Sequence, residues 1–231
     1  MKGNFADALA RLRFRAKFAR VLLVIQSVLL LVLPVLLIAN YFRSQAIRDI
    51  VVGGDYRPPI WLAAAPLATA VDIGLLLVVT LVAAVFTHLW IHRAHANLEM
   101  LGLQGLNYSP KWAVGSFFIP VSNLIVPFRA MRELCNRSFG ESEYQAHEPV
   151  GEVSSWWTCT LVGGAIVVLL LLMVLVEATT FFRFTTPTIA NLLLAGFGLL
   201  LLAGGSFFLF QIVGKVTSAQ NSVTGAAAAF A

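Results

Sequence analysis

The chain alternates between long apolar runs and shorter polar stretches, and four of the runs are long enough to cross a membrane. A helix rises about 1.5 Å per residue, so about 20 residues span the roughly 30 Å of hydrocarbon in a bilayer. The runs of this length cover residues 21–40, 69–91, 158–176 and 189–213. The pattern therefore predicts an all-α, polytopic membrane protein with four transmembrane helices in a single membrane domain, residues 21–217.

The residues that precede the first run predict an amphipathic helix. In residues 1–20, Phe5, Leu9, Leu12 and Ala16 recur at the spacing of one helical face, and basic residues fill much of the remainder. Such helices are typical of segments that lie on anionic lipid headgroups. At the other end of the chain, residues 218–231 are small, polar and weakly patterned, so we expect a disordered tail.

A fifth apolar stretch, residues 112–128, is interrupted by Pro120 and Pro127 and contains Asn123. The distribution of Lys and Arg tests whether it crosses the membrane, because cytosolic loops carry an excess of these residues. With four spans and cytosolic termini, twelve of the sixteen basic residues lie inside; with five spans the division becomes nine and seven. Four spans are favoured. Residues 93–137 are then expected to form a helical segment on the cytosolic side that is re-entrant or interfacial.

The composition agrees with a membrane protein and argues against one that binds nucleic acid. Hydrophobic residues occupy 59% of the 231 positions and charged residues 12%, which leaves too little polar surface for a soluble domain of this length. The net charge is +5, but six of the basic residues precede the first apolar run, where they act as a topology signal. We therefore expect no nucleic-acid partner.

Two short patterns are typical of helix starts. Thr69 and Asp72 form a Thr-x-x-acid capping box at the beginning of the second predicted span. Ser109 and Pro110 supply an N-cap residue and a proline at the first helical position. The helix start at Ser109 could also bind an anion, although capping alone explains the residues.

Other polar residues of the 93–137 segment have both a structural and a functional interpretation. Arg93 and Asn97 share one helical face, where they could satisfy irregular backbone or bind an anionic headgroup or solute. Asn123, between two prolines, could hydrogen-bond the backbone that they free or line a pore. Arg129 belongs to a basic helix that is expected to follow the apolar stretch.

Three histidines suggest a metal site, and no motif suggests catalysis. His88, His92 and His95 share a helical face, where imidazoles could bind a transition metal or ligate haem. No acidic or cysteine partner accompanies them at metal-ligand spacing, so polar contacts with neighbouring helices are the favoured interpretation. The chain has no GxSxG, HExxH or Walker A motif, and we expect neither an enzyme nor a cofactor.

Residues 93–134 read RAHANLEMLGLQGLNYSPKWAVGSFFIPVSNLIVPFRAMREL. The residues that carry a family resemblance are Arg93, Asn97, Gly102, Gly105, Tyr108, Ser109, Pro110, Trp112, Gly115, Pro120, Asn123, Pro127, Met131 and Glu133. At these positions the segment closely resembles the bacterial membrane family called domain of unknown function 4328. The resemblance covers about residues 69–213. It implies a small, multi-span bacterial membrane protein and supplies no mechanism.

Together these patterns favour a non-enzymatic protein of the bacterial inner membrane with both termini in the cytosol. We expect it to bind membrane lipid, anionic in particular, or a partner that is another membrane protein or a second copy of itself. The residues expected at the ligand are Arg93, Asn97, Ser109, Trp112, Asn123 and Arg129. Two alternatives remain open: a small channel or transporter whose path is lined by residues 109–128, and a metal- or haem-binding membrane protein.

Overall fold

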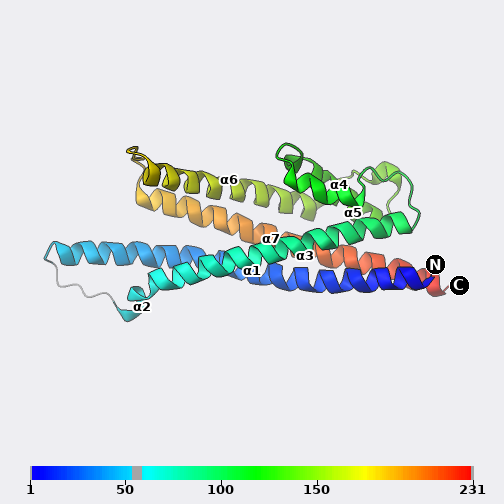
Figure 1. Cartoon of the computed structure of the whole chain (residues 1–231), viewed down its shortest axis with the longest axis horizontal. Coiled ribbons are helices and arrows are strands. Elements are labelled where there is room, and N and C mark those ends of the chain that lie inside the picture. The colour runs from blue at the N-terminus through cyan, green and yellow to red at the C-terminus, as the bar shows by residue number, and fades with distance from the viewer. Residues whose placement is uncertain (1, 54–58, 230–231) are drawn as a thin grey trace. The chain divides into compact units, whose positions relative to one another are not determined.

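Four long helices dominate the computed structural model, which describes residues 2–53 and 59–229, with side chains described for residues 5–53 and 59–222. They are α1 (Lys2–Val51), α3 (Ala65–Met100), α6 (Gly151–Thr179) and α7 (Thr188–Ala229) (Figure 1). Each contains a segment long and apolar enough to cross a membrane. The predicted all-α fold with four spans is confirmed, and the protein is a multi-pass membrane protein.

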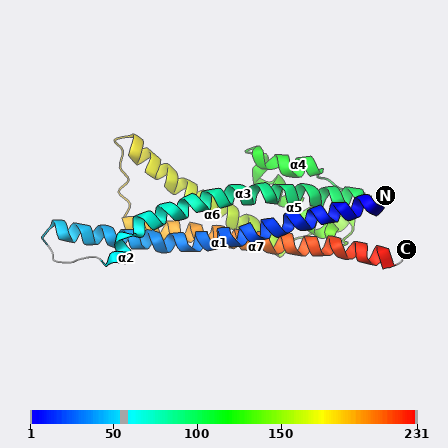
Figure 2. The same cartoon turned by 60° about the horizontal axis from the view of Figure 1, so that its bottom comes forward.

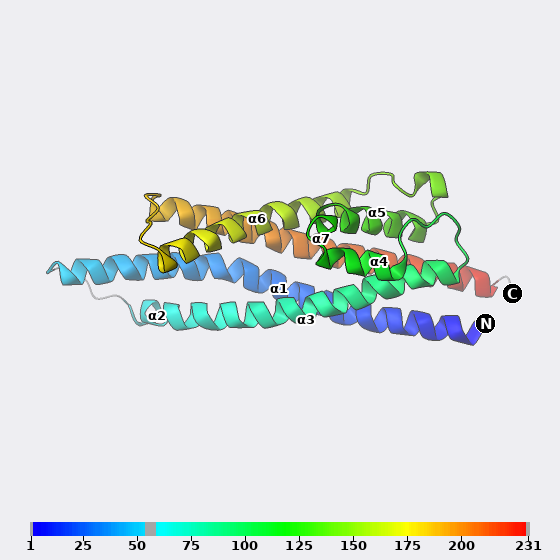
Figure 3. The same cartoon turned by 45° about the horizontal axis from the view of Figure 1, so that its top comes forward.

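Short helices make up the rest of the regular structure in the described residues. The α-helices among them are α2 (Ile60–Ala63), α4 (Pro110–Gly115) and α5 (Val126–Ser138). The 3₁₀ helices are Ser116–Phe118, Ser122–Leu124 and Glu143–Gln145. Figure 3 shows α4 and α5 packed together beside α3. The segment expected between the second and third spans is therefore a set of short helices.

The chain divides into two compact units, and every long helix contributes residues to both. Unit 1 consists of Met1–Val24, Thr80–Thr158 and Gly205–Ala231, and unit 2 consists of Ile25–Val79 and Cys159–Gly204. Within unit 1, the first turns of α1 and the last turns of α7 lie at the same end (Figures 1 and 3).

The core of unit 1 includes the apolar stripe of the first 20 residues. Leu9, Leu12 and Ala16 are buried in one cluster with side chains such as Trp90 of α3 and Val213 of α7. The stripe therefore contacts protein, whereas its sequence pattern predicted contact with lipid headgroups. These residues also form no separate arm, because residues 4–33 contain neither glycine nor proline to end the helix, and α1 continues directly into the first span.

Unit 2 is held together by leucines and by a close approach of two helices. Leu30 and Leu33 of α1 are buried against Leu199 of α7. A Cβ atom on Gly163 would lie 2.8 Å from the carbonyl oxygen of Gly198, so only glycine allows α6 and α7 to come this close. Beyond this crossing the two helices separate toward the loop that connects them (Figure 2).

The second span begins earlier than its predicted capping box. Helix α3 starts at Ala65, because Pro66 is well tolerated in a first turn. Thr69 is thus inside the helix: its hydroxyl donates to the Ala65 carbonyl at 2.8 Å and accepts from Asn40 of α1 at 2.6 Å. Asp72 is buried in the helix interior and is no cap.

Helix α7 also continues where a disordered tail was expected. It extends to Ala229, and Gln220 within this stretch is almost fully buried. Alanine-rich sequence without proline supports a helix, and the Gln220 amide finds buried partners. Residues 230 and 231 of the expected tail lie outside the described residues. So does Arg57, one of the four basic residues that the four-span topology places on the outer side of the membrane.

Candidate functional site

Helix α4 begins as the sequence predicts. Ser109 is its N-cap, and the Ser109 hydroxyl accepts a hydrogen bond from the Trp112 backbone N–H at 3.3 Å. Pro110 occupies the first helical position, where its missing N–H costs no hydrogen bond. Capping therefore accounts for Ser109, while the Trp112 side chain is partly exposed.

Residues 116–125 carry large apolar side chains that no described residue covers. Phe118 is 75% exposed, Val121 77% and Leu124 56%. The backbone is nevertheless held in place, because the Trp157 indole N–H donates to the Leu124 carbonyl at 3.1 Å. The neighbouring Phe117 ring contacts His88 of α3 edge to face, with centroids 4.6 Å apart. We call residues 116–125 the apolar loop.

Basic side chains from three helices gather around Arg93 and His92 of α3. We call Arg11 and Arg15 of α1, Arg93 of α3 and Lys111 of α4 the basic cluster. Arg15 donates to the Leu89 carbonyl at 2.8 Å, next to the residue that contacts the loop. Arg11 and Arg15 both act electrostatically on Arg93. His92 interacts electrostatically with the positive charges of Arg15, Arg93 and Lys111. It also interacts with the negative charge of Glu99.

Arg93 lies in this cluster and forms no ion pair with any side chain that the structure describes. Its guanidinium donates to the Met100 sulfur at 3.3 Å, and its buried Nε has no hydrogen-bond partner within the described chain. A guanidinium surrounded by other cations is destabilised by their repulsion. An anion from outside the chain would relieve this repulsion.

Asn97, which the sequence paired with Arg93, has a different environment. Its side chain is fully buried and its amide donates to the Gln220 side-chain oxygen of α7 at 3.0 Å. Gln220 in turn donates to the Ala94 carbonyl at 3.1 Å and to the Ser138 hydroxyl at 3.0 Å. Asn97 therefore joins α3, α5 and α7 through the Gln220 side chain, whereas the sequence predicted a contact with irregular backbone or with an anion.

Glu133 is one of the residues that carry the family resemblance, and in the structure it organises the loop after α3. The carboxylate is fully buried and accepts from the backbone N–H groups of Asn107, at 3.1 Å, and Tyr108, at 3.3 Å. The loop turns at Gly102 and Gly105, whose φ angles of 70° and 75° favour glycine. The sequence feature that could have indicated this role is the position of Glu133 among the apolar residues on one face of an amphipathic helix.

Asn136, one turn further along α5, fixes the loop that leads to α6. Its side-chain amide donates to the carbonyls of Gln145, Ala146 and Glu148 at 3.0–3.1 Å. Nothing in the local sequence distinguished this asparagine from an exposed one. The polar side chains on the buried face of α5 thus hold two loops in place.

The remaining predicted residues are more exposed. Asn123 is half-buried, and its side-chain amide has no hydrogen-bond partner among the described residues; its backbone N–H donates to the Ile119 carbonyl at 2.7 Å. Arg129 is exposed on α5. These two residues remain available to a ligand, but the structure does not bring them into one site with Asn97.

The three histidines do not assemble a metal site. His95 is buried with its Nδ1 atom 3.0 Å from the Ile91 carbonyl, whereas His92 is exposed and His88 packs on Phe117. Within the part of the chain that is described, no three His, Cys, Asp or Glu side chains are arranged to hold a metal ion. The structure gives the metal or haem alternative no support.

Cys135 of α5 lies outside the spans, and the pKa of its thiol is strongly altered. Burial, with a smaller contribution from the Glu152 carboxylate, raises the pKa of its thiol to about 12, and the Lys215 ammonium partly opposes this rise. The thiol therefore stays protonated at neutral pH, which makes it a poor nucleophile.

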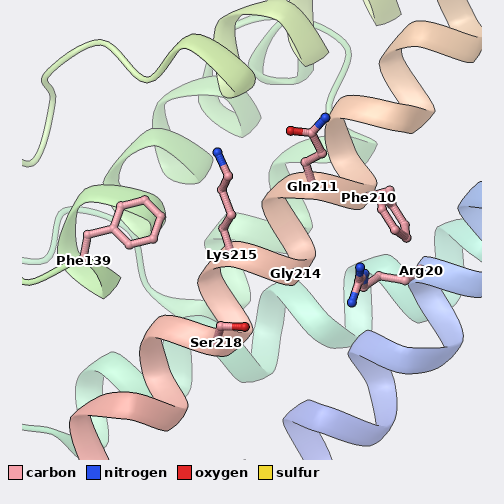
Figure 4. Close-up of a pocket in the computed structure, with 7 residues that line it drawn as sticks. All are labelled: Arg20, Phe139, Phe210, Gln211, Gly214, Lys215 and Ser218. Atoms are coloured by element: carbon pink, nitrogen blue, oxygen red, sulfur yellow. The ribbon is translucent and has the colours of Figure 1, made fainter.

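A shallow groove lies on α7 within unit 1 (Figure 4). Gly214, Lys215 and Ser218 form its floor, with Gln211 and Phe210 one turn away. Arg20 of α1 borders one side, and Phe139, at the end of α5, borders the other. The groove has a volume of about 490 Å³ and is open to its surroundings.

Comparison with known proteins identifies a family. No curated protein and no solved structure shows significant similarity to the chain. A family profile described as a domain of unknown function matches most of the chain. The match includes the short helices, most of the length of α3, α6 and α7, and the groove residues Gly214 and Lys215. The resemblance seen in residues 93–134 is thereby confirmed: the chain belongs to the family of the domain of unknown function DUF4328, over residues 56–217.

Proposed function

We propose that this protein is a non-enzymatic component of the bacterial inner membrane that binds anionic lipid through its basic cluster. The observation that carries the proposal is that Arg15, Arg93 and Lys111 interact electrostatically with His92. His92 lies one turn along α3 from His88, which contacts Phe117 and Phe118 of the apolar loop. Lipid offers a matching pair of environments, with anionic phosphate above and hydrocarbon below. In the proposed arrangement the apolar loop enters the cytosolic leaflet and the basic cluster lies at the headgroups.

The surroundings of the apolar loop support this arrangement. Large apolar side chains exposed to water in a contiguous patch are unfavourable, whereas insertion into a bilayer gains roughly 25 cal/mol per Å² of apolar surface. The backbone polar groups of a broken segment need partners at such a depth. Two of them have such partners: Leu124 accepts from Trp157, and Asn123 donates to Ile119.

A binding role also agrees with how the buried polar groups are used. Asn97, Glu133 and Asn136 all make hydrogen bonds that join helices and loops. They are thereby committed to structure, and the basic cluster is left with unsatisfied charge. We further propose that both termini are cytosolic, because that topology puts most basic residues on the inner side.

Lipid analysis of purified variants tests the role of the basic cluster. We expect Arg93→Ala to reduce the amount of anionic lipid that co-purifies in mild detergent, relative to zwitterionic lipid, as measured by mass spectrometry. Arg48→Ala is a matched control, since Arg48 is an exposed arginine that lies in unit 2. Equal anionic lipid content in the wild type and Arg93→Ala would refute lipid binding by the cluster.

Spin labels test the depth of the apolar loop separately. In a variant without Cys135 and Cys159, a label on Val121→Cys should be accessible to oxygen and shielded from a water-soluble nickel complex. Ser142→Cys, an exposed position in the connection from α5 to α6, should show the reverse. A label on Val121→Cys that is as accessible to nickel as the one on Ser142→Cys would rule out insertion of the loop.

A further inference from the structure

The groove on α7 contains an arginine whose position depends on a glycine. Arg20 lies over the Phe210 ring, with its guanidinium carbon 4.2 Å from the ring centroid. A Cβ atom on Gly214 would lie 3.3 Å from the same guanidinium carbon. The absence of a side chain at Gly214 therefore gives Arg20 the room to lie flat on α7, between an aromatic ring and bare backbone (Figure 4).

The charge of the groove is not balanced by the described side chains. Lys215 forms an ion pair with Glu152 at the start of α6. Arg20 forms no ion pair with any described residue, and its buried Nε lacks a hydrogen-bond partner. The groove thus has an excess of one positive charge, and the Arg20 guanidinium retains donors in the fork geometry that suits phosphate.

Along α7, the groove and the turn that precedes it change in polarity in the order found in a phospholipid. Phe207 is about half exposed and stacks with Phe210, their centroids 6.5 Å apart. The next turn brings Gly214 and Lys215, and the turn after that the Ser218 hydroxyl. Acyl chains, phosphate and headgroup would meet apolar, cationic and hydroxyl groups in that sequence. On α1, likewise, Arg20 is the last basic residue before the apolar run.

We propose that this groove is a specific site for one anionic glycerophospholipid. The phosphate contacts Arg20, the acyl chains follow Phe210 and Phe207, and the headgroup reaches Ser218. The single excess charge matches a phosphodiester whose headgroup carries no cation, as in phosphatidylglycerol. This site rests on the proposed location in a membrane, but it is separate from the basic cluster, which attracts anionic lipid without a defined stoichiometry.

Native mass spectrometry of the full chain in detergent tests the site with dioleoyl phosphatidylglycerol and dioleoyl phosphatidylcholine. The wild type should bind one phosphatidylglycerol in preference to phosphatidylcholine. Arg20→Gln should weaken this binding about tenfold, because a charge-assisted hydrogen bond is lost. Gly214→Ala should weaken it as well, since the new methyl group displaces the guanidinium. Inorganic phosphate should not compete, because the acyl chains contribute to binding.

Three controls separate this site from general effects. Lys17→Gln removes an exposed charge one turn from Arg20, and Gly204→Ala adds a methyl group that meets only the Cys159 sulfur, at an ordinary 3.7 Å. Both should bind phosphatidylglycerol like the wild type. Arg93→Ala should lower the binding of additional lipids and leave the single phosphatidylglycerol site intact. A result against lipid binding by the basic cluster can therefore be told apart from a result against the groove. The groove is no lipid site if the wild type does not prefer phosphatidylglycerol, if Arg20→Gln binds it normally, or if inorganic phosphate displaces it.

Discussion

Three asparagines of unit 1 show how differently one side chain is used in this protein. Asn97 is buried and bonded to Gln220, and Asn136 donates to a row of loop carbonyls. Asn123 is half-buried, with no partner for its amide in the described residues. Removing the partner of a buried amide lowers the free energy of unfolding far more than removing an amide that makes no hydrogen bond within the protein.

This difference predicts unequal effects of the same substitution. Asn97→Ala should lower the free energy of unfolding by about 1–3 kcal/mol, because it leaves the Gln220 oxygen buried without a donor. Asn123→Ala should change it little. Thermal unfolding in detergent measures both, and Asn123→Ala serves as the matched control. Equal melting temperatures for the two variants would contradict the role given to the Asn97–Gln220 bond.

The raised pKa of the Cys135 thiol predicts very slow chemical labelling near neutral pH. Because the raised pKa keeps the thiol protonated up to about pH 12, the fraction of reactive thiolate stays very small from about pH 7 to 9, where an ordinary thiol ionises. In Cys159→Ala, maleimide should not label the folded protein across this range, and should label it after unfolding. Adding Ser142→Cys supplies an exposed positive control. Labelling of folded Cys135 as fast as that of the cysteine at position 142 would contradict the prediction.

At the scale of helices, the crossing of α6 and α7 depends on one of two adjacent glycines. A Cβ atom on Gly163 would meet the Gly198 backbone at 2.8 Å, whereas one on Gly164 meets nothing within 4 Å. Gly163→Ala should therefore destabilise the protein by about 1–3 kcal/mol through overpacking. Gly164→Ala should be neutral or slightly stabilising, because alanine favours helix. The melting temperature in detergent should be lower for Gly163→Ala than for Gly164→Ala, and equal values would contradict the prediction.

The spans could be predicted from the sequence because apolar length is a local property. Residues 69–91 and 158–176 both lie inside observed helices. Helix ends were less predictable, because hydropathy marks where the apolar run stops and not where the hydrogen-bonded turns stop. Helix α1 therefore absorbed the predicted arm, and α7 absorbed most of the predicted tail.

The candidate site could be predicted only in part. Ser109 was recognisable because a cap and its helix are adjacent in sequence. The partners of Asn97 and Glu133 lie 123 and 26 residues away, and no local pattern encodes such a pairing. The basic cluster also combines α1 with α3 and α4, so the sequence identified Arg93 without its two neighbouring arginines.

At the scale of the whole molecule, the proposed orientation gives a direct experiment. With cytosolic termini, the α6–α7 loop lies outside and the connection from α5 to α6 lies inside. A membrane-impermeant maleimide applied to intact cells should label Thr185→Cys and spare Ser142→Cys, although both positions are exposed. Breaking the cells should make Ser142→Cys reactive. The opposite pattern of labelling would reverse the orientation.

The bond between Asn97 and Gln220 also has a consequence for biosynthesis. A ribosome makes α1 and α3 well before α7, since chains grow from the N-terminus at about 5–20 residues per second. Until Gln220 has been made, the Asn97 amide has no partner and the α1 side chains around Leu12 lack part of their core. Unit 1 therefore closes late, although its first helix is the first to emerge. A nascent chain stalled before α7 would display an unsatisfied amide, which is a feature that insertion factors or membrane proteases could recognise.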